Sequence, residues 1–500
     1  MSGPGAGGAG SAETGRQSSL GISVGDTVER FELDRAWLVD PVTGREGPGQ
    51  IVVGDGILES VEWLSGAEAE GVTERGVVVA PGFFDIHAHF REPGFEDAET
   101  IATGCAAAAH GGYTTVALMP NTQPAVDDPG VLARVRLAVS ASASPVEVQA
   151  YGAVSAGRAG EQLSAMGELA DAGVVGYSDD GAPVRTGRLL RSALLYAGML
   201  GLPVVDHAED LELTAGAEAH EGYVASVMGL AGWPVAAEVN AVSRDLAVLA
   251  DALADEPRAR LHLTHVSTAA ALDLVRRARG RGLPVTCDVT PHHLAFTDEW
   301  IAGARRWSWE ALDADGRVRD PWVDGAIVAG PYATALRVNP PLSDPADAAA
   351  CLAALLDGTA DAVATDHAPH TVVDKEVEFG KASNGISGIE TALGVLLVLV
   401  DAGRLPLARA VAALTTGPAA VMAASTATHG AAVSRPRGLV EGSPADLVVF
   451  DRSDRWLVSP ESLLSKGKNS PLLGRELPGR VLVTIAAGRL AYADLETGDS

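Results

Sequence analysis

The sequence predicts an α/β fold: a parallel eight-stranded barrel, with β-rich segments at both ends of the chain. Between Val77 and Thr416, short β-rich runs alternate with longer helical patterns, as in parallel α/β barrels. Segments 26–76 and 434–500 are short, turn-rich and β-prone. With 500 residues, 47% of them apolar, the chain is long enough for one large barrel and a small satellite domain.

Eight runs are expected to form the barrel strands. They are centred on Phe84, Val116, Val148, Val175, Val204, Leu263, Val285 and Val363. The first helix is expected from about Asp97 to His110, because it would then carry acidic residues in its first turn and end at two glycines, as helix termini favour.

A pair of histidines stands at the end of the first predicted strand. In PGFFDIHAHFREPG, residues 81–94, His87 and His89 are two positions apart, so their side chains share a face and could hold one metal ion. Taken alone, the pair could equally be a packed core histidine beside a surface histidine. The rest of the chain decides between these interpretations.

Eight strings along the chain occur in an order that resembles one enzyme family. They are the string just quoted, GGYTTVALMPNTQP (111–124), DDG (179–181), HAED (207–210), HVST (265–268), TPHHL (290–294), NPPL (339–342) and ATDHAPH (364–370). From about Gly25 onward the chain resembles the dihydroorotases, and more narrowly the longer bacterial type within the amidohydrolase superfamily. Each string alone is weak evidence, but eight in the right order are strong evidence.

The resemblance implies a (β/α)8 TIM-like metal-dependent hydrolase barrel and a small discontinuous β-sandwich. The barrel is expected over residues 77–433, and the sandwich is expected to combine residues 25–76 with residues 434–500. Residues 1–24 are rich in Gly, Ala and Ser, a composition that predicts a disordered tail.

The resemblance also implies a metal centre at the carboxyl ends of the strands, where barrel enzymes carry their active sites. The expected ligands are His87, His89, Asp180, His207, His265 and Asp366. They imply one or two zinc ions per chain, with a shared hydroxide as the nucleophile. Asp366 is the expected proton shuttle. By contrast, His262 is out of phase with His265 and is expected to face the helices.

The bridging ligand distinguishes branches of the superfamily. Hydantoinases and allantoinases bridge two metals with a carboxylated lysine after strand four, but here that strand runs GVVGYSDDG, and the first lysine of the whole chain is Lys375. A carboxylate is therefore expected to bridge. Asp180 matches the family position by its spacing to His207, and Asp179 is expected to bond the following turn.

Substrate selection requires a group that binds a carboxylate. Arg91 offers a planar fork for a bidentate contact. The resemblance adds further substrate-binding residues, namely Asn121, Asn339, His370 and the backbone of Gly385. Residues 298–336, which carry Trp300, Trp307, Trp309 and Trp322, are longer than typical. They predict a packed excursion or a subunit contact, with ordinary satellite core as the simpler explanation.

Composition restricts partners and location. A net charge of −28 disfavours nucleic acid and anionic lipid, and no apolar run is long enough to span a membrane. The N-terminus lacks the order of a secretory signal, and the three cysteines match no disulfide, zinc or redox spacing, so a cytoplasmic location is expected. Besides the small-molecule substrate, the expected partners are other copies of the chain and, as a further candidate, aspartate carbamoyltransferase.

Three other functions compete with dihydroorotase. A hydantoinase or allantoinase would share the metals, but the missing lysine and the presence of Arg91, Asn121 and His370 count against it. A non-catalytic partner of aspartate carbamoyltransferase would have lost metal ligands, whereas this chain keeps all six. A plain metal-binding module would leave the substrate-side residues unexplained.

Overall fold

The structure is a computed structural model that describes residues 23–423 and 438–494. Within them, eight parallel strands form a closed barrel in chain order. The strands are β5 (Phe83–Ala88), β6 (Tyr113–Leu118), β7 (Glu147–Ala150), β8 (Tyr177–Ser178), β9 (Val204–Asp206), β12 (Leu261–Leu263), β13 (Val285–Val289) and β14 (Ala362–Val363). Bridges between Gly152 and Tyr177 and between Ala88 and His367 join the three-stranded and five-stranded parts. The predicted α/β barrel is confirmed, and of the expected strand centres only Val175 lies outside its strand, two residues before β8.

Helices surround the barrel, except the last of them, which packs against its interior. They are α1 (Ile101–His110), α2 (Pro129–Ser142), α3 (Met166–Asp171), α4 (Gly187–Leu200), α5 (Tyr223–Met228), α6 (Val235–Ala252), α7 (Ala269–Gly280), α8 (Pro291–Ala295), α9 (Glu299–Ala302), α10 (Pro345–Asp357), α11 (Val372–Lys375), α12 (Ala392–Asp401), α13 (Leu407–Leu414) and α14 (Thr416–Ala423). Two short strands, β10 (Ala219–His220) and β11 (Gly232–Trp233), pair beside α5. None of the helices described is long and apolar enough to cross a membrane.

Apolar side chains fill the barrel interior. Phe84 of β5, Tyr151 directly after β7 and Val205 of β9 pack together with Val421 and Met422 of α14. Helix α14 therefore packs into the barrel, whereas polar side chains gather beyond the carboxyl ends of the strands. This division between an apolar interior and a polar rim is what positions the candidate site.

The first helix begins later than predicted. Helix α1 starts at Ile101, where the side chain of Thr100 accepts a hydrogen bond from the backbone N–H of Thr103. Asp97 and Glu99 therefore precede the helix, and the expectation of acidic residues in its first turn was wrong. The physical reason is that the first-turn N–H groups find acceptors outside the helix: Thr100 accepts from Thr103, and the carboxylate of Glu92 accepts from the N–H of Ile101 at 2.9 Å.

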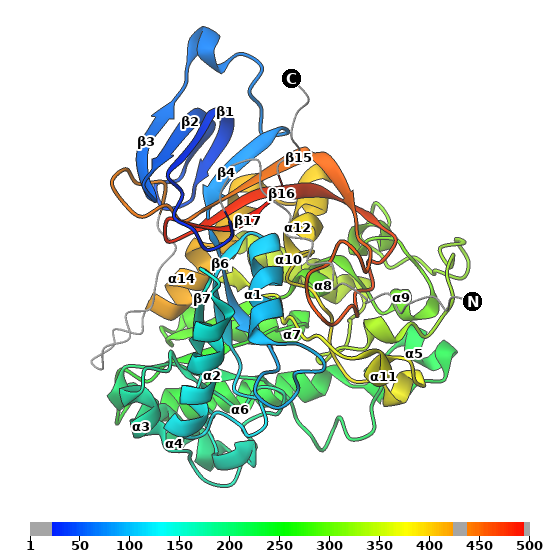
Figure 1. Cartoon of the computed structure of the whole chain (residues 1–500). Helices are drawn as coiled ribbons and strands as arrows, with labels where there is room; N and C mark the ends of the chain where they lie inside the picture. The colour runs from blue at the N-terminus through cyan, green and yellow to red at the C-terminus, as the bar shows by residue number, and fades with distance from the viewer. Residues whose placement is uncertain (1–22, 424–437, 495–500) are drawn as a thin grey trace, which may run out of the picture.

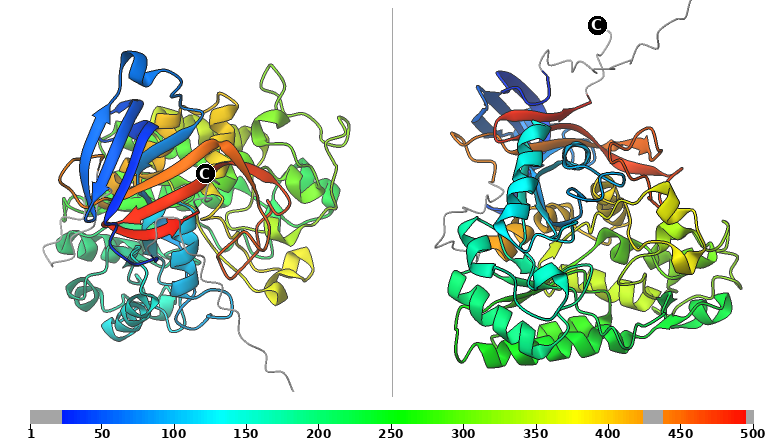
Figure 2. Two further views of the ribbon diagram at one scale, coloured as in Figure 1. Left: turned by 45° about the horizontal axis from the view of Figure 1, so that its top comes forward. Right: turned by 60° about the horizontal axis from the view of Figure 1, so that its bottom comes forward.

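The two terminal segments pair into one seven-stranded sheet, in the order β17-β16-β15-β4-β1-β2-β3 (Figures 1 and 2). Its strands are β1 (Arg30–Asp40), β2 (Arg45–Gly54), β3 (Ile57–Trp63), β4 (Val77–Pro81), β15 (Leu447–Leu457), β16 (Glu476–Ala486) and β17 (Arg489–Ala493). Val79 of β4 joins the two halves, because it pairs with Leu38 of β1 on one side and with Val449 of β15 on the other. Apolar residues of both halves, including Leu38, Ile51 and Ile485, share one core.

The sheet extends further along the chain than the expected boundary at residue 77. Strand β4 lies in the sheet, because its pairing partners are β1 and β15, and the first barrel strand begins at Phe83. Residues 1–22 of the proposed tail lie outside the described residues. The same holds for residues 434–437 and 495–500 of the proposed sandwich.

Three of the four tryptophans of residues 298–336 form a local core. Trp300 is fully buried and packs on Phe296, with ring centroids 4.4 Å apart. Trp307 lies 5.9 Å from Trp300 and stacks on Trp309 at 5.7 Å. These contacts fit satellite core, the simpler of the explanations that the sequence allowed.

Candidate metal centre and substrate pocket

All six predicted ligands converge at the carboxyl ends of the barrel strands. They come from five strands: His87 and His89 from the end of β5, Asp180 after β8, His207 after β9, His265 after β12 and Asp366 after β14. All six are at least nine-tenths buried. Two sets of three have donor atoms within 4.8 Å of one another, namely His87, Asp180 and His265, and His87, His89 and Asp366.

Asp180 lies at the centre of this cluster. Its Oδ2 is 3.2 Å from Nε2 of His87 and 3.4 Å from Nε2 of His89. Its Oδ1 is 3.3 Å from Nε2 of His265 and 3.6 Å from Nδ1 of His207. One carboxylate thus faces two pairs of imidazoles from opposite oxygens, which is the arrangement that a bridging ligand requires.

Asp179 points elsewhere. Its carboxylate accepts hydrogen bonds from the backbone N–H of Ser155 at 3.0 Å and from the hydroxyl of Ser155 at 2.5 Å. The guanidinium of Arg158 donates to the backbone carbonyl oxygens of Asp179 and Asp180, at 3.0 Å and 2.6 Å. The aspartate pair therefore divides into one carboxylate that binds a loop and one that faces the histidines.

The histidines are oriented as metal ligands are. The outer nitrogens of three of them contact other side chains: Nδ1 of His87 lies 2.6 Å from Oγ1 of Thr264, Nδ1 of His89 lies 2.8 Å from Oδ1 of Asn121, and Nε2 of His207 lies 2.8 Å from Oε2 of Glu209. When a neutral imidazole donates the N–H of its outer nitrogen, its inner nitrogen keeps a lone pair that can bind a metal.

Those inner nitrogens face one another. Nε2 of His87 is 3.3 Å from Nε2 of His89, and Nδ1 of His207 is 3.0 Å from Nε2 of His265. For His87 and His89, whose outer nitrogens donate to Thr264 and Asn121, these are facing lone pairs, which repel unless a cation lies between them. Four imidazoles and two carboxylates therefore fit one or two divalent metal ions, and imidazole with carboxylate suits zinc.

The charges of the cluster show the same demand for a cation. Burial by itself lowers the pKa of His87, but the charge of Asp180 and the hydrogen bond to it raise the pKa to about 9. Burial likewise opposes protonation of His207, while Asp180 and Glu209 raise its pKa to about 10. The carboxylates therefore favour positive charge on two of the four histidines, whereas burial lowers the pKa of His89.

Three site residues have an unusual backbone. Eight non-glycine residues of the described chain have positive φ, and among them are Arg91 at 61°, His265 at 41° and Asp366 at 47°. Such conformations are costly for residues with a Cβ and cluster at functional sites. The sharp turns after β5, β12 and β14 therefore aim these side chains at the rim.

Arg91 and His370 lie side by side next to the cluster. Nε of Arg91 donates to the carbonyl oxygen of Pro369 at 3.0 Å, and Nη2 lies 3.2 Å from Nε2 of His370. Burial lowers the pKa of His370 to about 3 and that of Arg91 to about 10, so the imidazole is neutral and the guanidinium charged at neutral pH. Nε2 of His370 also lies 2.7 Å from the carbonyl oxygen of Asn384, so the neutral ring donates its N–H there, and among the described residues Nη1 and Nη2 of Arg91 remain for a ligand.

The other expected substrate residues are partly engaged within the protein. Asn121 directs Oδ1 at His89, which leaves its amide nitrogen to face a ligand. Nδ2 of Asn339 donates to Glu209 at 3.1 Å, and its buried Oδ1 has no partner in the described chain. The N–H of Gly385 donates to Arg337, and its carbonyl accepts from Asn469. A ring contact from Gly385 therefore has to use the second lone pair of that carbonyl.

Sequence reasoning missed a group of residues behind the ligands. Asp288 accepts hydrogen bonds from the backbone N–H of His265 at 2.7 Å and from Oγ1 of Thr264 at 3.2 Å. His262 was expected to face the helices, and this was wrong. It pairs in register with Val205, an interior residue, and its Nε2 donates to Asp288 at 2.9 Å. The sequence did carry a signal for Glu209, because this residue stands two positions after the predicted ligand His207 in HAED.

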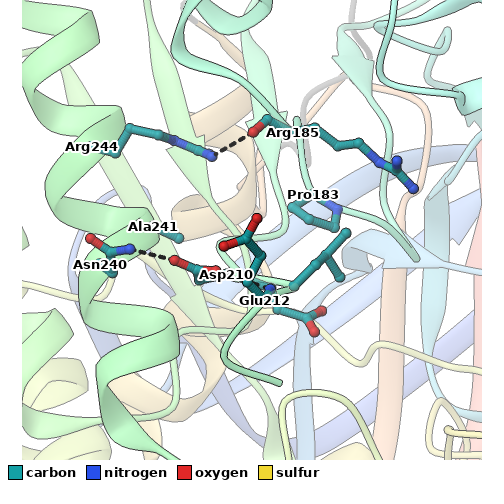
Figure 3. Close-up of a pocket in the computed structure, with 9 residues that line it drawn as sticks. Pro183, Arg185, Asp210, Glu212, Asn240, Ala241 and Arg244 are labelled. Carbon is teal, nitrogen blue, oxygen red and sulfur yellow. Dashed lines mark hydrogen bonds between the residues drawn. The ribbon is translucent and has the colours of Figure 1, made fainter. Parts of the chain in front are cut away.

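A cavity of about 580 Å³ includes Glu209 in its lining, and Figure 3 shows other residues that line it. Asp210 and Asn240, which are hydrogen bonded to each other, contribute to its lining, and Nη1 of Arg244 donates to the carbonyl oxygen of Arg185 at 3.4 Å. The predicted ligands do not line it. Glu209, which bonds His207, joins this cavity to the cluster.

Comparison with known proteins agrees with the geometry. A family model described as "Dihydro-orotase-like" matches residues 76–270. A dihydroorotase of Anaeromyxobacter dehalogenans is 43% identical over 461 residues, 91% of this chain and 96% of that protein. One from Pelotomaculum thermopropionicum is 41% identical over 460 residues, 91% of this chain and 97% of its own length.

Solved structures share the fold at lower identity. The L-hydantoinase (dihydropyrimidinase) of Arthrobacter aurescens superposes with a TM-score of 0.71 at 23% identity, covering 93% of this chain and 96% of its own. The dihydropyrimidinase of Brevibacillus agri gives 0.69 at 21% identity, with 93% and 95% covered. At these identities only the fold is established. On the identity and coverage of the curated relatives, the chain belongs to the dihydroorotase family.

Proposed function

We propose that the chain catalyses the reversible hydrolysis of the ring amide of L-dihydroorotate to N-carbamoyl-L-aspartate, with ring closure as the direction used in pyrimidine biosynthesis. The observation that carries this proposal is the position of Arg91 beside six convergent histidine and aspartate side chains of the kinds that bind metals, without a lysine among them. The cluster suits hydrolysis of an amide, and the arginine suits a substrate with a carboxylate. In hydrolysis the ring C–N bond breaks and a C–O bond forms.

The proposed ligands are His87, His89, Asp180, His207, His265 and Asp366, with Asp180 as the bridge, and the proposed metal is zinc, one or two ions per chain. When bound, the metal supplies Lewis acidity and an activated water. The chain's own part is to hold the imidazoles in one tautomer. Thr264, Asn121 and Glu209 do this by accepting the outer N–H groups.

Asp366 is the proposed proton carrier. Its Oδ1 lies 3.1 Å from Nε2 of His89 and 3.5 Å from Nε2 of His87, so it faces the point where the ligands meet. In hydrolysis it takes the proton that the attacking water loses and gives it to the departing ring nitrogen. In ring closure the proton moves the other way.

Arg91 is the proposed anchor of the substrate carboxylate, through Nη1 and Nη2. Asn121 and His370 are proposed to contact the same anion, and Asn339 and Gly385 the ring. The buried Oδ1 of Asn339 supports this, because it has no partner among the described residues and would accept a ring N–H. The proposed setting is the cytoplasm, with self-association and aspartate carbamoyltransferase as proposed partners.

The decisive experiment is an ultraviolet assay of both directions with purified protein, run beside hydantoin and allantoin hydrolysis. Conversion of carbamoyl aspartate and dihydroorotate with little action on the other two rings is expected. His87→Ala/His89→Ala serves as the inactive control. Preference for hydantoin or allantoin would instead assign the chain to that branch, and metal binding without any turnover would reject an enzyme.

A further inference from the structure

Lys375, the last residue of α11, is buried at 6% exposure, although Val372 and Val373 of the same helix are exposed. Its Nζ donates to three backbone carbonyl oxygens: Thr334 at 3.1 Å, Arg337 at 3.3 Å and Ser383 at 2.6 Å. An ammonium has three N–H donors, so the group and its surroundings match in number.

The three acceptors belong to two separate segments. Thr334 lies near the end of the tryptophan-containing segment, residues 298–336, and Arg337 follows it directly. Ser383 begins the loop of residues 383–385. Two further bonds join these segments, because the N–H of Gly385 donates to the carbonyl of Arg337 at 2.8 Å and Nε of Arg337 donates to Oδ1 of Asn384 at 3.0 Å. The ammonium therefore lies where the two segments meet.

The 383–385 loop leads directly to the proposed carboxylate site. Nε2 of His370 lies 2.7 Å from the carbonyl oxygen of Asn384 and 3.2 Å from Nη2 of Arg91. The loop also packs tightly, since a Cβ on Gly385 would lie 2.6 Å from the Cβ of Ala368. A shift of this loop would consequently move His370 and change the position of Arg91.

The charge of Lys375 can change near neutral pH. Burial lowers its pKa to about 7, the charges of Arg337 and Arg91 add to the decrease, and Asp374 opposes it. The groups that face it are Arg337 beside the tryptophan-containing segment, Arg91 after β5, His370 after β14 and Asp374 on its own helix. A neutral amine would have two N–H donors for three carbonyl groups.

We propose that Lys375 is a positioning residue: its ammonium group holds the 383–385 loop against His370, so that Arg91 meets the substrate carboxylate in one orientation. This inference rests on the proposed function, because it concerns binding of an anionic substrate. Losing the ammonium, by substitution or by deprotonation, weakens substrate binding and leaves the chemical step in place.

The first test compares Lys375→Met with Lys381→Met, which removes an exposed lysine paired with Glu378 nearby. We expect KM for carbamoyl aspartate to rise about tenfold in Lys375→Met, with kcat within about threefold and unchanged zinc content, as for loss of uniform binding. Lys381→Met should match the wild type, and Lys375→Arg should recover part of the loss. In the wild type, KM should rise as the pH passes about 7, and this rise should be absent from Lys375→Met.

The second test needs no substrate. Hydrogen–deuterium exchange of the peptide around Gly385 should be faster in Lys375→Met than in Lys381→Met. In the wild type above pH 7, this exchange should increase more than the intrinsic pH dependence of amide exchange accounts for. Equal exchange in both variants, or a fall in kcat with unchanged KM, would overturn the inference. If Lys375→Met fails to fold, the wild-type pH profiles of KM and exchange decide. Absence of cyclisation by the wild type would reject the proposed function instead, while the exchange comparison still tests whether Lys375 holds the loop.

Discussion

Oε2 of Glu209 lies 2.8 Å from Nε2 of His207 and accepts its N–H. The same carboxylate accepts hydrogen bonds from the hydroxyl of Thr214 at 2.5 Å and from Nδ2 of Asn339 at 3.1 Å. A carboxylate held by two other donors fixes the plane of the imidazole, so Nδ1 of His207 faces Asp180. Glu209 is therefore part of the candidate metal centre although it is not one of its proposed ligands.

Glu209→Gln is expected to weaken metal retention by about 10-fold to 100-fold, because the neutral amide polarises the imidazole less and can turn its NH2 toward it. The measurement is the rate at which zinc is lost to a chelator. Glu212→Gln, an exposed residue of the same segment, is the matched control. Equal zinc loss in the two variants would show that Glu209 has no such role.

Asp180 as the bridge predicts that reconstitution needs no carbon dioxide. Apoprotein loaded with zinc in buffer stripped of carbon dioxide and bicarbonate should regain full activity, because no lysine has to be carboxylated. Between one and two zinc ions per chain are expected, and His87→Ala/His89→Ala should lose them. A requirement for bicarbonate would contradict the carboxylate bridge.

Asp366→Asn should reduce turnover in both directions by roughly 100-fold or more, since one group carries the proton both ways. Much of the zinc should remain, because five other ligands are unchanged. Initial rates of hydrolysis and of ring closure, measured on the same metal-loaded preparation, check this. If ring closure survived while hydrolysis was lost, another residue would have to carry the proton.

Arg91→Met should cost about 3 to 5 kcal/mol in transition-state stabilisation, because a largely buried substrate anion would be left unpaired. Arg91→Lys should restore only part of this, since an ammonium cannot reproduce two parallel guanidinium contacts. The quantity measured is kcat/KM, with zinc content as the control for the metal centre. A neutral ring amide should respond little to either change. Turnover of dihydroorotate within a few-fold of the wild type would make Arg91 a bystander.

Trp300→Ala should destabilise the fold by about 3 to 5 kcal/mol, because the ring is fully buried against Phe296 and Trp307. Denaturant unfolding provides the measurement. Trp322→Ala is the comparison, since Trp322 is only partly buried and contacts Tyr223 alone among the aromatic rings described. A small loss of unfolding free energy in Trp300→Ala would mean that residues 298–336 are not packed as core.

The sequence by itself determined the barrel, the order of its strands and the residue types at their carboxyl ends. Strings such as DIHAH and ATDHAPH carry both an apolar strand and the polar residues after it, so local pattern is sufficient there. The choice of Asp180 over Asp179 as the residue facing the histidines also followed from spacing, and the geometry agrees with it.

Only the tertiary structure decided which residues stand behind the ligands. Thr264 and Asp288 reach the cluster because the barrel brings together strand ends that are far apart in the chain, whereas Glu209 bonds His207 from two residues away. The error at His262 has a local origin. Strand β12 ends at Leu263, and His265 lies beyond it with φ at 41°, so strand alternation no longer relates the two histidines. A period of two holds only while the backbone stays extended, and the turn that aims His265 inward breaks that condition.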